Sequence, residues 1–349
     1  DVPTNGRATA LRLWRSAAGI RWRLVVAAVA AVLYVATDLM TPVYAASLID
    51  HLWAGIQQAF ANGKTFRVTM ENGGVDILVY LGIWMLAWAF YSVQSLVMAS
   101  FAERLNLKLR EEISRKVERL PLRYFDSHKP GDTISRATND LDKVSEVLQR
   151  GLLQIIISAI TLVGALILMA RMSLLLTGVF LVFAALSAVL TKVVAARTLA
   201  VAARRQDVLG RLTGRVEEAY SGRAVIKAFG REEESLARVR GDAEELEQVS
   251  AHADFLTNAI SPAIRFLMRL AQVICGVLAG GMLVAGRLTV GSFQAFFQYV
   301  LKASEPLTQL SLTLNMLQGA LAAAERVFVL LDEEEVVPDP KTPATLAEP

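Results

Sequence analysis

The feature that most constrains this chain is a run from Ile83 to Leu120 without glycine or proline, the two residues that most often end a helix. The first part of the run is apolar and the second part is charged, so one helix can continue from one part into the other. At about 1.5 Å per residue, a helix from Asp76 to Leu120 would be roughly 65 Å long, whereas the hydrocarbon core of a bilayer is about 30 Å thick. More than half of that helix must therefore lie in water.

The charged part of this predicted helix carries a narrow apolar stripe. Leu105, Leu109, Ile113 and Val117 recur every four residues, and Leu120 follows after three, with Glu, Arg and Lys between them. This spacing is typical of a helix that packs one face against neighbouring helices. The pattern alone fits either a solvated helical hairpin or a helix whose far end contacts a partner.

Composition indicates the class of protein. Hydrophobic residues make up 54% and charged residues 20% of the 349 residues, with a mean hydropathy of +0.42, which favours a membrane protein with large polar segments. A single cysteine, Cys275, excludes an internal disulfide framework. The three histidines are far apart in sequence, so no metal site is expected, and no nucleic-acid partner is expected either.

Six apolar runs are each long enough to cross a bilayer. They cover about 24–49, 76–101, 152–170, 172–195, 259–285 and 289–317. Long charged, helix-favouring segments at 102–151 and 196–258 separate the second run from the third and the fourth from the fifth. We therefore predict an all-α membrane protein with six transmembrane helices and long intracellular helical extensions.

The distribution of basic residues predicts the orientation. Lys and Arg number 11 in residues 102–151, 11 in 192–258 and five in residues 1–23. Because Lys and Arg are enriched in cytoplasmic segments, both termini and both long segments should be cytoplasmic. Arg and Trp are interleaved in residues 1–23, which favours a tail followed by a helix in the headgroup region. Residues 24–331 would then form the membrane domain and residues 332–349 a linker.

One segment has part of a phosphate-binding motif. Gly63-Lys64-Thr65 matches the end of such a loop, but the motif requires a glycine five positions earlier, where Gln58 stands. No other Gly-Lys-Ser/Thr triplet occurs in these residues. We therefore expect no cofactor in this chain.

The second long segment repeats the design of the first. No glycine or proline occurs from Val179 to Leu209, and we expect Gly210 and Gly214 to interrupt the helix. The chain would then turn near residues 206–212, as it turns near residues 124–130 after the first long helix. Two such turns at the same cytoplasmic depth would form a surface for a partner.

Several groups of residues resemble the transmembrane domain of ABC exporters, over residues 12–335. Tyr124-Phe125, Gly131, Ser135-Arg136 and Asp140 resemble the first intracellular loop of that family. Glu218, Gly222, Val225, Lys227-Ala228-Phe229 and Glu232 resemble the segment after its second coupling helix. Thr41-Pro42 with Leu48-Ile49-Asp50 resembles the end of its first span, and Gly291, Pro306 and the segment from Ala324 to Asp332 resemble its sixth span and exit.

The resemblance implies a half-transporter. Six helices would pair with those of an identical or related chain in a twelve-helix, domain-swapped dimer in a bacterial inner membrane. Short coupling helices would dock on nucleotide-binding domains, in cis or in trans, that bind ATP and Mg²⁺ and drive alternating access, in the direction of export. The residues implied in coupling are Tyr124, Phe125, Asp126, His128, Lys129, Pro130, Asp207, Val208, Leu209, Gly210 and Arg211.

Charged residues inside the apolar runs are candidates for the substrate cavity, because charges are costly in hydrocarbon. If the fifth and sixth runs form an antiparallel hairpin, helical rise places Arg269 beside Lys302 and Arg265 beside Glu305. These cations could attract an anionic amphiphile such as a lipid or fatty acid. They could equally reach the headgroups by snorkelling, with Arg265 and Glu305 as an ion pair.

Asp38 lies deeper in the first run and could contact a cationic group, or could bond to Thr41 or a neighbouring helix. From a different functional class, an ATP-independent membrane scaffold or channel would also fit a sequence without an ATPase motif.

Overall fold

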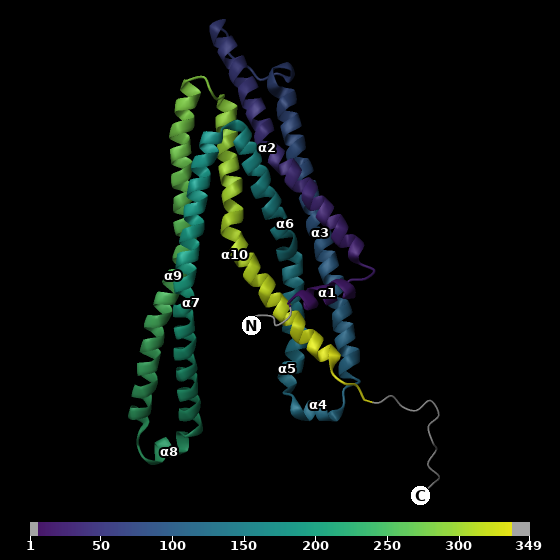
Figure 1. Ribbon diagram of the computed structural model, residues 1–349, viewed down its shortest axis with the longest axis vertical. Helices are drawn as coiled ribbons and strands as arrows, with labels where there is room; N and C mark the ends of the chain where they lie inside the picture. Colours follow the sequence, from purple (N-terminus) through teal and green to yellow (C-terminus); the bar gives the residue numbers. More distant parts are fainter. Residues whose placement is uncertain (1–5, 337–349) are drawn as a thin grey trace, which may run out of the picture. The chain divides into compact units, whose positions relative to one another are not determined.

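The computed structural model describes residues 6–336, without the side chains of residues 71, 72, 307, 308, 310–312, 314 and 315, and every regular element in this part is a helix (Figure 1). The predicted tail and linker therefore lie partly outside the described residues. Of the linker at 332–349, Asp332 ends the last helix and residues 333–336 follow without helical structure.

The described part of the chain divides into two compact units, one formed by residues 6–168 and 288–336 and the other by residues 169–287. The first unit contains, within the described residues, α1 (Gly6–Ser16), α2 (Arg21–Ala61), a π-helical turn η1 (Met70–Gly74), α3 (Val75–Val117), α4 (Leu122–Ser127), α5 (Pro130–Ser135), a π-helical turn η2 (Arg136–Asp140), most of α6 (Leu141–Met172) and α10 (Val290–Asp332).

The predicted long helix is confirmed as α3, which has 43 residues and so extends about 65 Å. Its apolar stripe is also confirmed, since Leu105, Leu109 and Ile113 are at most 2% exposed and Val117 packs against the same cluster. Side chains of α4, α6 and the last third of α10 complete this cluster. The core of the first unit thus lies where the polar half of α3 meets these elements.

Helices α2 and α10 pack antiparallel at very short range. A Cβ on Gly291, in the first turn of α10, would lie 2.0 Å from the backbone oxygen of Ala46 in α2, so only glycine fits there without a shift. The amide of Gly291 donates a 2.8 Å hydrogen bond to Asp50 Oδ1, and the Tyr299 hydroxyl donates one of 2.6 Å to the Leu39 carbonyl.

The second unit is an antiparallel pair of long helices, α7 (Leu174–Ser221) and α9 (Glu232–Val284), joined by the short α8 (Arg223–Ala228). Small side chains of α9 at four-residue spacing, Ala271, Cys275 and Ala279, are buried, and the Cys275 thiol contacts the Leu176 carbonyl of α7 at 3.7 Å. Figure 1 shows α8 at the end of this pair.

Five helical stretches in the described residues are long and apolar enough to cross a membrane: Arg21–Ala61, Val75–Val117, Pro130–Met172, Leu174–Ser221 and Glu232–Val284. These correspond to the first five predicted runs. The sixth, 289–317, lies within the continuous helix α10, which is not among the five. The fold is thus that of an all-α membrane protein.

The predicted position of the second turn is wrong. Residues 206–212 lie within α7, which continues to Ser221, and the chain turns at Gly222 and α8 instead. Gly210 and Gly214 have nothing within 4 Å of where a Cβ would lie, so neither marks a turn or a close contact. A glycine inside a helix costs only about 1 kcal/mol, which packing of α7 against α9 readily offsets.

Candidate functional site

The first candidate surface is the short helix α4, between the long helices of the first unit. Pro121 precedes it in an extended conformation, His128 ends it with φ −120° and ψ 141°, and Pro130 begins α5. Proline has no backbone N–H and disfavours the helical conformation in the residue before it, so a helix usually ends before a proline. Pro121 therefore separates α4 from α3, and Pro130 separates it from α5. This confirms a short helix at the predicted turn near residues 124–130.

The two faces of α4 have different environments. Tyr124 is 5% exposed and belongs to the core cluster, and its ring stacks on His128 with centroids 4.2 Å apart. Leu122 is 83% exposed and Phe125 is 41% exposed. Asp126, Lys129 and Pro130 are exposed as well. The predicted residues therefore divide into an inward pair, Tyr124 and His128, which shapes the surface, and outward residues that can touch a partner.

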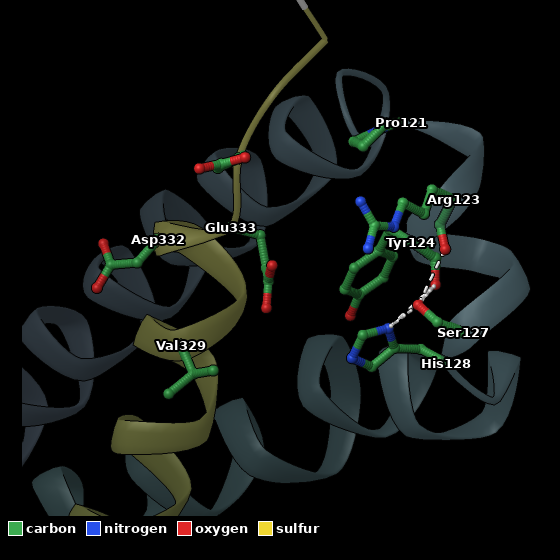
Figure 2. Close-up of a pocket in the computed structure, with 9 residues that line it drawn as sticks. Pro121, Arg123, Tyr124, Ser127, His128, Val329, Asp332 and Glu333 are labelled. Atoms are coloured by element: carbon green, nitrogen blue, oxygen red, sulfur yellow. Dashed lines mark hydrogen bonds between the residues drawn. The ribbon is translucent and has the colours of Figure 1, made fainter.

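A pocket of about 560 Å³ separates α4 from the end of α10. Figure 2 shows Tyr124 and His128 on one wall and Val329 and Glu333 on the other. The Oγ of Ser127 lies 3.0 Å from Nδ1 of His128, but it also lies 2.9 Å from the Arg123 carbonyl and 3.1 Å from the Tyr124 carbonyl, to which its proton can be donated. The hydrogen bonds of Ser127 and His128 are thus made within α4 and its C-terminal end.

Two ion pairs, neither of which was predicted, hold the end of α10 in the first unit. The guanidinium of Arg326 donates hydrogen bonds to both carboxylate oxygens of Asp140 in η2, at 3.0 and 2.6 Å. Asp140 is 4% exposed. Arg12 of α1 binds Asp332 in the same manner, at 2.5 and 2.7 Å. Both Asp140 and Arg326 belong to the groups of residues that resemble ABC exporters, and this was the available signal for the first pair.

These contacts shift the ionisation of their members in the expected directions. The hydrogen bond to Asp140 raises the pKa of Arg326, and the hydrogen bonds from Arg12 lower the pKa of Asp332 below its usual 3.8. The lowered pKa of Asp332 and the raised pKa of Arg12 both favour the charged form of the Arg12–Asp332 pair.

The second candidate surface is α8, at the end of α7 and α9. Tyr220, Val225 and Phe229 are 70%, 62% and 76% exposed, and grooves of about 400 and 600 Å³ flank α8. Exposed aromatic and aliphatic side chains at the end of a helical pair are typical of an interaction site. The resemblance of Val225 and Phe229 to ABC exporters was the sequence signal for this surface. It was assigned to the segment after the coupling helix, because the turn was expected near Gly210.

The residues predicted for the second coupling helix lie elsewhere on α7. Val208 is 1% exposed and packs inside the unit, whereas Asp207, Leu209 and Gly210 are exposed along the helix. Arg211 binds Glu245 of α9 at 2.6 Å. These residues hold or line the α7–α9 pair, and none of them lies at the turn.

The charged residues of the predicted cavity are only partly brought together. Lys302 of α10 binds Asp38 of α2 at 2.5 Å, with 22% and 18% of their side chains exposed, so the cationic contact considered for Asp38 is with a residue of this chain. The Thr41 hydroxyl donates to the backbone oxygen of Asp38 at 2.8 Å.

Arg265 and Arg269 are exposed on α9, and Arg269 donates to Gln272 at 3.0 Å. Because α9 belongs to the second unit, its juxtaposition with Lys302 and with the exposed Glu305 stays a prediction. Among the described residues, no group of three or more His, Cys, Asp or Glu side chains is arranged to hold a metal ion.

The chain is similar to known transporters over most of its length. The family described as the ABC transporter transmembrane region matches residues 24–306. A fatty acid ABC transporter ATP-binding/permease protein of Mycobacterium tuberculosis is 32% identical over 290 residues, which are 83% of this chain and 45% of that protein. The uncharacterized ABC transporter ATP-binding protein YfiC of Bacillus subtilis is 30% identical over 342 residues, 96% of this chain and 54% of that protein.

An ATP-dependent lipid A-core flippase of Thiobacillus denitrificans is 28% identical over 319 residues, 90% of this chain and 52% of that protein. The chain therefore spans about half the length of the curated relatives that it matches. Its five long apolar helices agree with the family match, which covers more than three quarters of the chain. It is an integral membrane protein and belongs to the ABC transporter transmembrane family.

Proposed function

We propose that this chain is the transmembrane half of an ATP-driven transporter that exports a lipid-like molecule across a bacterial inner membrane. The observation that carries the proposal is the family match over residues 24–306. Its relatives include proteins named for fatty acids and for lipid A-core, both of which are amphipathic substrates with long apolar chains.

In this proposal α4 and α8 are the coupling helices. Leu122 and Phe125 on α4, and Val225 of α8 with the flanking Tyr220 and Phe229, supply the apolar surface that a nucleotide-binding domain would bury. That domain, on the same or another polypeptide, would bind ATP and Mg²⁺. This assignment moves the second coupling helix from residues 206–212 to residues 223–228, because α7 continues past the earlier position.

The proposal includes a sixth membrane span in α10 and a dimer with an identical or related chain. Closure of two nucleotide-binding domains would then move the long helices and switch the cavity between its inward-facing and outward-facing states. The cytoplasmic placement of both termini and both long segments follows from the excess of Lys and Arg in them.

For the substrate we propose an anionic, lipid-like molecule that Arg265 and Arg269 attract. Lys302 contributes less than the sequence indicated, because Asp38 neutralises it at 2.5 Å. Replacing Arg265 and Arg269 together by Gln should reduce export of a fatty acid more than export of a neutral acyl alcohol of equal chain length. Equal losses for the two substrates would contradict a charge-selective cavity.

The coupling role is tested by Phe125→Asp in the complete transporter, reconstituted in proteoliposomes. A buried contact residue of this kind is worth about 2 kcal/mol or more at an interface, so transport per ATP hydrolysed should fall about tenfold or more. Leu199→Asp is the matched control, since Leu199 is a 74% exposed apolar residue of α7 away from α8.

Transport by Phe125→Asp at the rate of the unchanged protein would contradict the coupling role. Tyr124→Asp does not test it, since Tyr124 is in the core and its replacement would destabilise the fold. Transport without ATP in the unchanged protein would favour a channel instead.

A further inference from the structure

Helix α1 has two faces of different chemistry. Arg7, Leu11, Trp14 and Arg15 have the spacing i, i+4, i+7 and i+8, which places them on one side of a helix. All four are exposed, with Leu11 at 51% and Trp14 at 44%. Thr9, on the opposite side, is 6% exposed. The exposed side, called here the outward face of α1, thus combines two cations with two large apolar side chains.

The opposite side of α1 is bound to the rest of the first unit. The guanidinium of Arg12 binds both oxygens of Asp332 and lies 4.4 Å from the ring centroid of Phe328, which places it over α10. The Lys108 ammonium of α3 donates to the carbonyl of Ser16, the last residue of α1, at 2.7 Å. Because these contacts fix the inward side, the direction of the outward face is also fixed within this unit.

The side chains of the outward face are suited to binding an anionic lipid surface. Residues 6–23 contain five arginines and no Asp or Glu, and in the described part of the chain neither Arg7 nor Arg15 forms an ion pair. Trp is favoured where hydrocarbon meets headgroups, and Arg binds phosphate with a planar set of donors. The apolar helix α2 begins at Arg21, five residues after α1 ends, so α1 lies next to the start of a membrane span.

Arg12 is one of several basic residues that bind carboxylates where the chain leaves α10. Lys116 and Arg119, at the end of α3, lie 3.1 and 3.7 Å from the carboxylate of Glu335. The amide of Val336 donates to the Arg119 carbonyl at 2.9 Å. Arg12 connects this exit to the helix that carries the lipid-binding chemistry, because its guanidinium binds Asp332 at the end of α10.

We propose that the outward face of α1 binds anionic lipid headgroups and that this binding favours the Arg12–Asp332 contact, so that the charge of the inner leaflet controls how firmly the exit of α10 is held. Headgroups bound to Arg7 and Arg15 keep α1 in the orientation that directs Arg12 to Asp332. The device does not depend on which substrate is transported or in which direction.

The test measures release of α1 in the complete transporter. Ala17 directly follows α1, is 1% exposed and belongs to the core cluster, so a cysteine in Ala17→Cys can react only when α1 leaves its place. Its rate of labelling by an uncharged maleimide is compared in nanodiscs of phosphatidylcholine alone and of phosphatidylcholine with phosphatidylglycerol. The uncharged reagent prevents the surface potential from changing the rate by itself.

We expect labelling to be about fivefold slower, or more, with phosphatidylglycerol, since each basic residue near an anionic surface contributes about that factor. Replacing Arg7 and Arg15 together by Gln should remove most of the difference between the two lipids. Arg240→Gln, an exposed arginine on α9, is the matched control and should leave the difference unchanged. Arg12→Gln should make labelling fast in both lipids.

Four results would overturn the proposal. Equal labelling rates in the two lipids would show that the outward face of α1 does not respond to anionic headgroups. Faster labelling with phosphatidylglycerol would show that headgroups compete with Asp332 for Arg12 and open the contact. Retention of the lipid difference when Arg7 and Arg15 are both replaced by Gln, or its loss in Arg240→Gln, would assign the effect to other cations.

Discussion

Gly291→Ala should be among the most damaging single-methyl changes in this chain. The new Cβ would lie 2.0 Å from the Ala46 oxygen and 2.6 Å from the Ala46 carbonyl carbon, both backbone atoms that no side-chain rotation can move. Ordinary contact begins at 3.4 Å, so α10 must move away from α2 by more than an ångström. Such a shift also breaks the 2.8 Å hydrogen bond from the Gly291 amide to Asp50.

The magnitude follows from these two losses. Overpacking at a tight contact costs about 1–3 kcal/mol, and loss of a hydrogen bond to a charged group costs about 1.5–3 kcal/mol. Because the shift can relieve part of the overlap, we expect a total of about 3–5 kcal/mol. In a unit of roughly 200 residues, where each kcal/mol lowers the midpoint by about 2–4 °C, this corresponds to a midpoint lower by about 6–20 °C.

The assay is thermal unfolding of the detergent-solubilised protein, followed by circular dichroism. Gly280→Ala is the matched control, since Gly280 is also helical but has nothing within 4 Å of a new Cβ. That variant should be unchanged or up to about 1 kcal/mol more stable, because alanine favours helices. If Gly291→Ala unfolds at the temperature of Gly280→Ala, the close approach of α2 and α10 is refuted.

Three further predictions follow from single contacts. In a double-mutant cycle of Asp140→Asn and Arg326→Gln, each single change should cost about 2–4 kcal/mol of unfolding free energy, less than for a fully buried pair, and a coupling below about 0.5 kcal/mol would contradict the pairing. The lowered pKa of Asp332 implies that its pairing with Arg12 contributes stability above the usual carboxyl pKa of 3.8 and loses it as pH falls through the lower folded value. Maleimides react with the thiolate, so the labelling rate of Ala17→Cys is divided by that of the unfolded protein at the same pH. This ratio should rise below about pH 4, and a ratio that is independent of pH there would argue against the pair. The Cys275 thiol is 1% exposed, so it should react with a maleimide only in denaturant; fast reaction in the folded protein would show that α7 and α9 separate there.

Local sequence patterns predicted the long helices well, because helix length and apolar spacing follow directly from the residues themselves. The stripe of Leu105, Leu109 and Ile113 is buried as its spacing required, and Pro121 and Pro130 confine α4. Each of these features depends on neighbours within a few residues, where 3.6 residues per turn is a sufficient guide.

The errors arose where tertiary packing decides. Gly210 indicates a break by its propensity, but α7 continues because residues on either side of it bind α9, among them Arg211 with Glu245. The turn at Gly222 and α8 therefore lies about 16 residues, or between four and five helical turns, after the position expected at residues 206–212. A propensity of about 1 kcal/mol is small compared with the packing of a whole helical face.

The ion pairs could not be predicted from local patterns. Asp140 and Arg326 are 186 residues apart, and Arg12 and Asp332 are 320 apart. The sequence contains many carboxylates that each arginine could bind, and only the packing of the helices determines which one lies next to it. Lys302 illustrates the same limit. Helical rise places it at the depth of Arg269, but its ion-pair partner in the structure is Asp38 of α2.

The length of α9 has a mechanical consequence. With 53 residues it extends about 80 Å, so a tilt of about 5° displaces one end relative to the other by about 7 Å. A domain that bound α8 and moved it sideways by the width of a water molecule or two would thus reorient the far end of α9 without breaking a single backbone hydrogen bond. Pro262 lies inside α9 and cannot donate a backbone hydrogen bond, so any bending of this long lever would be concentrated there.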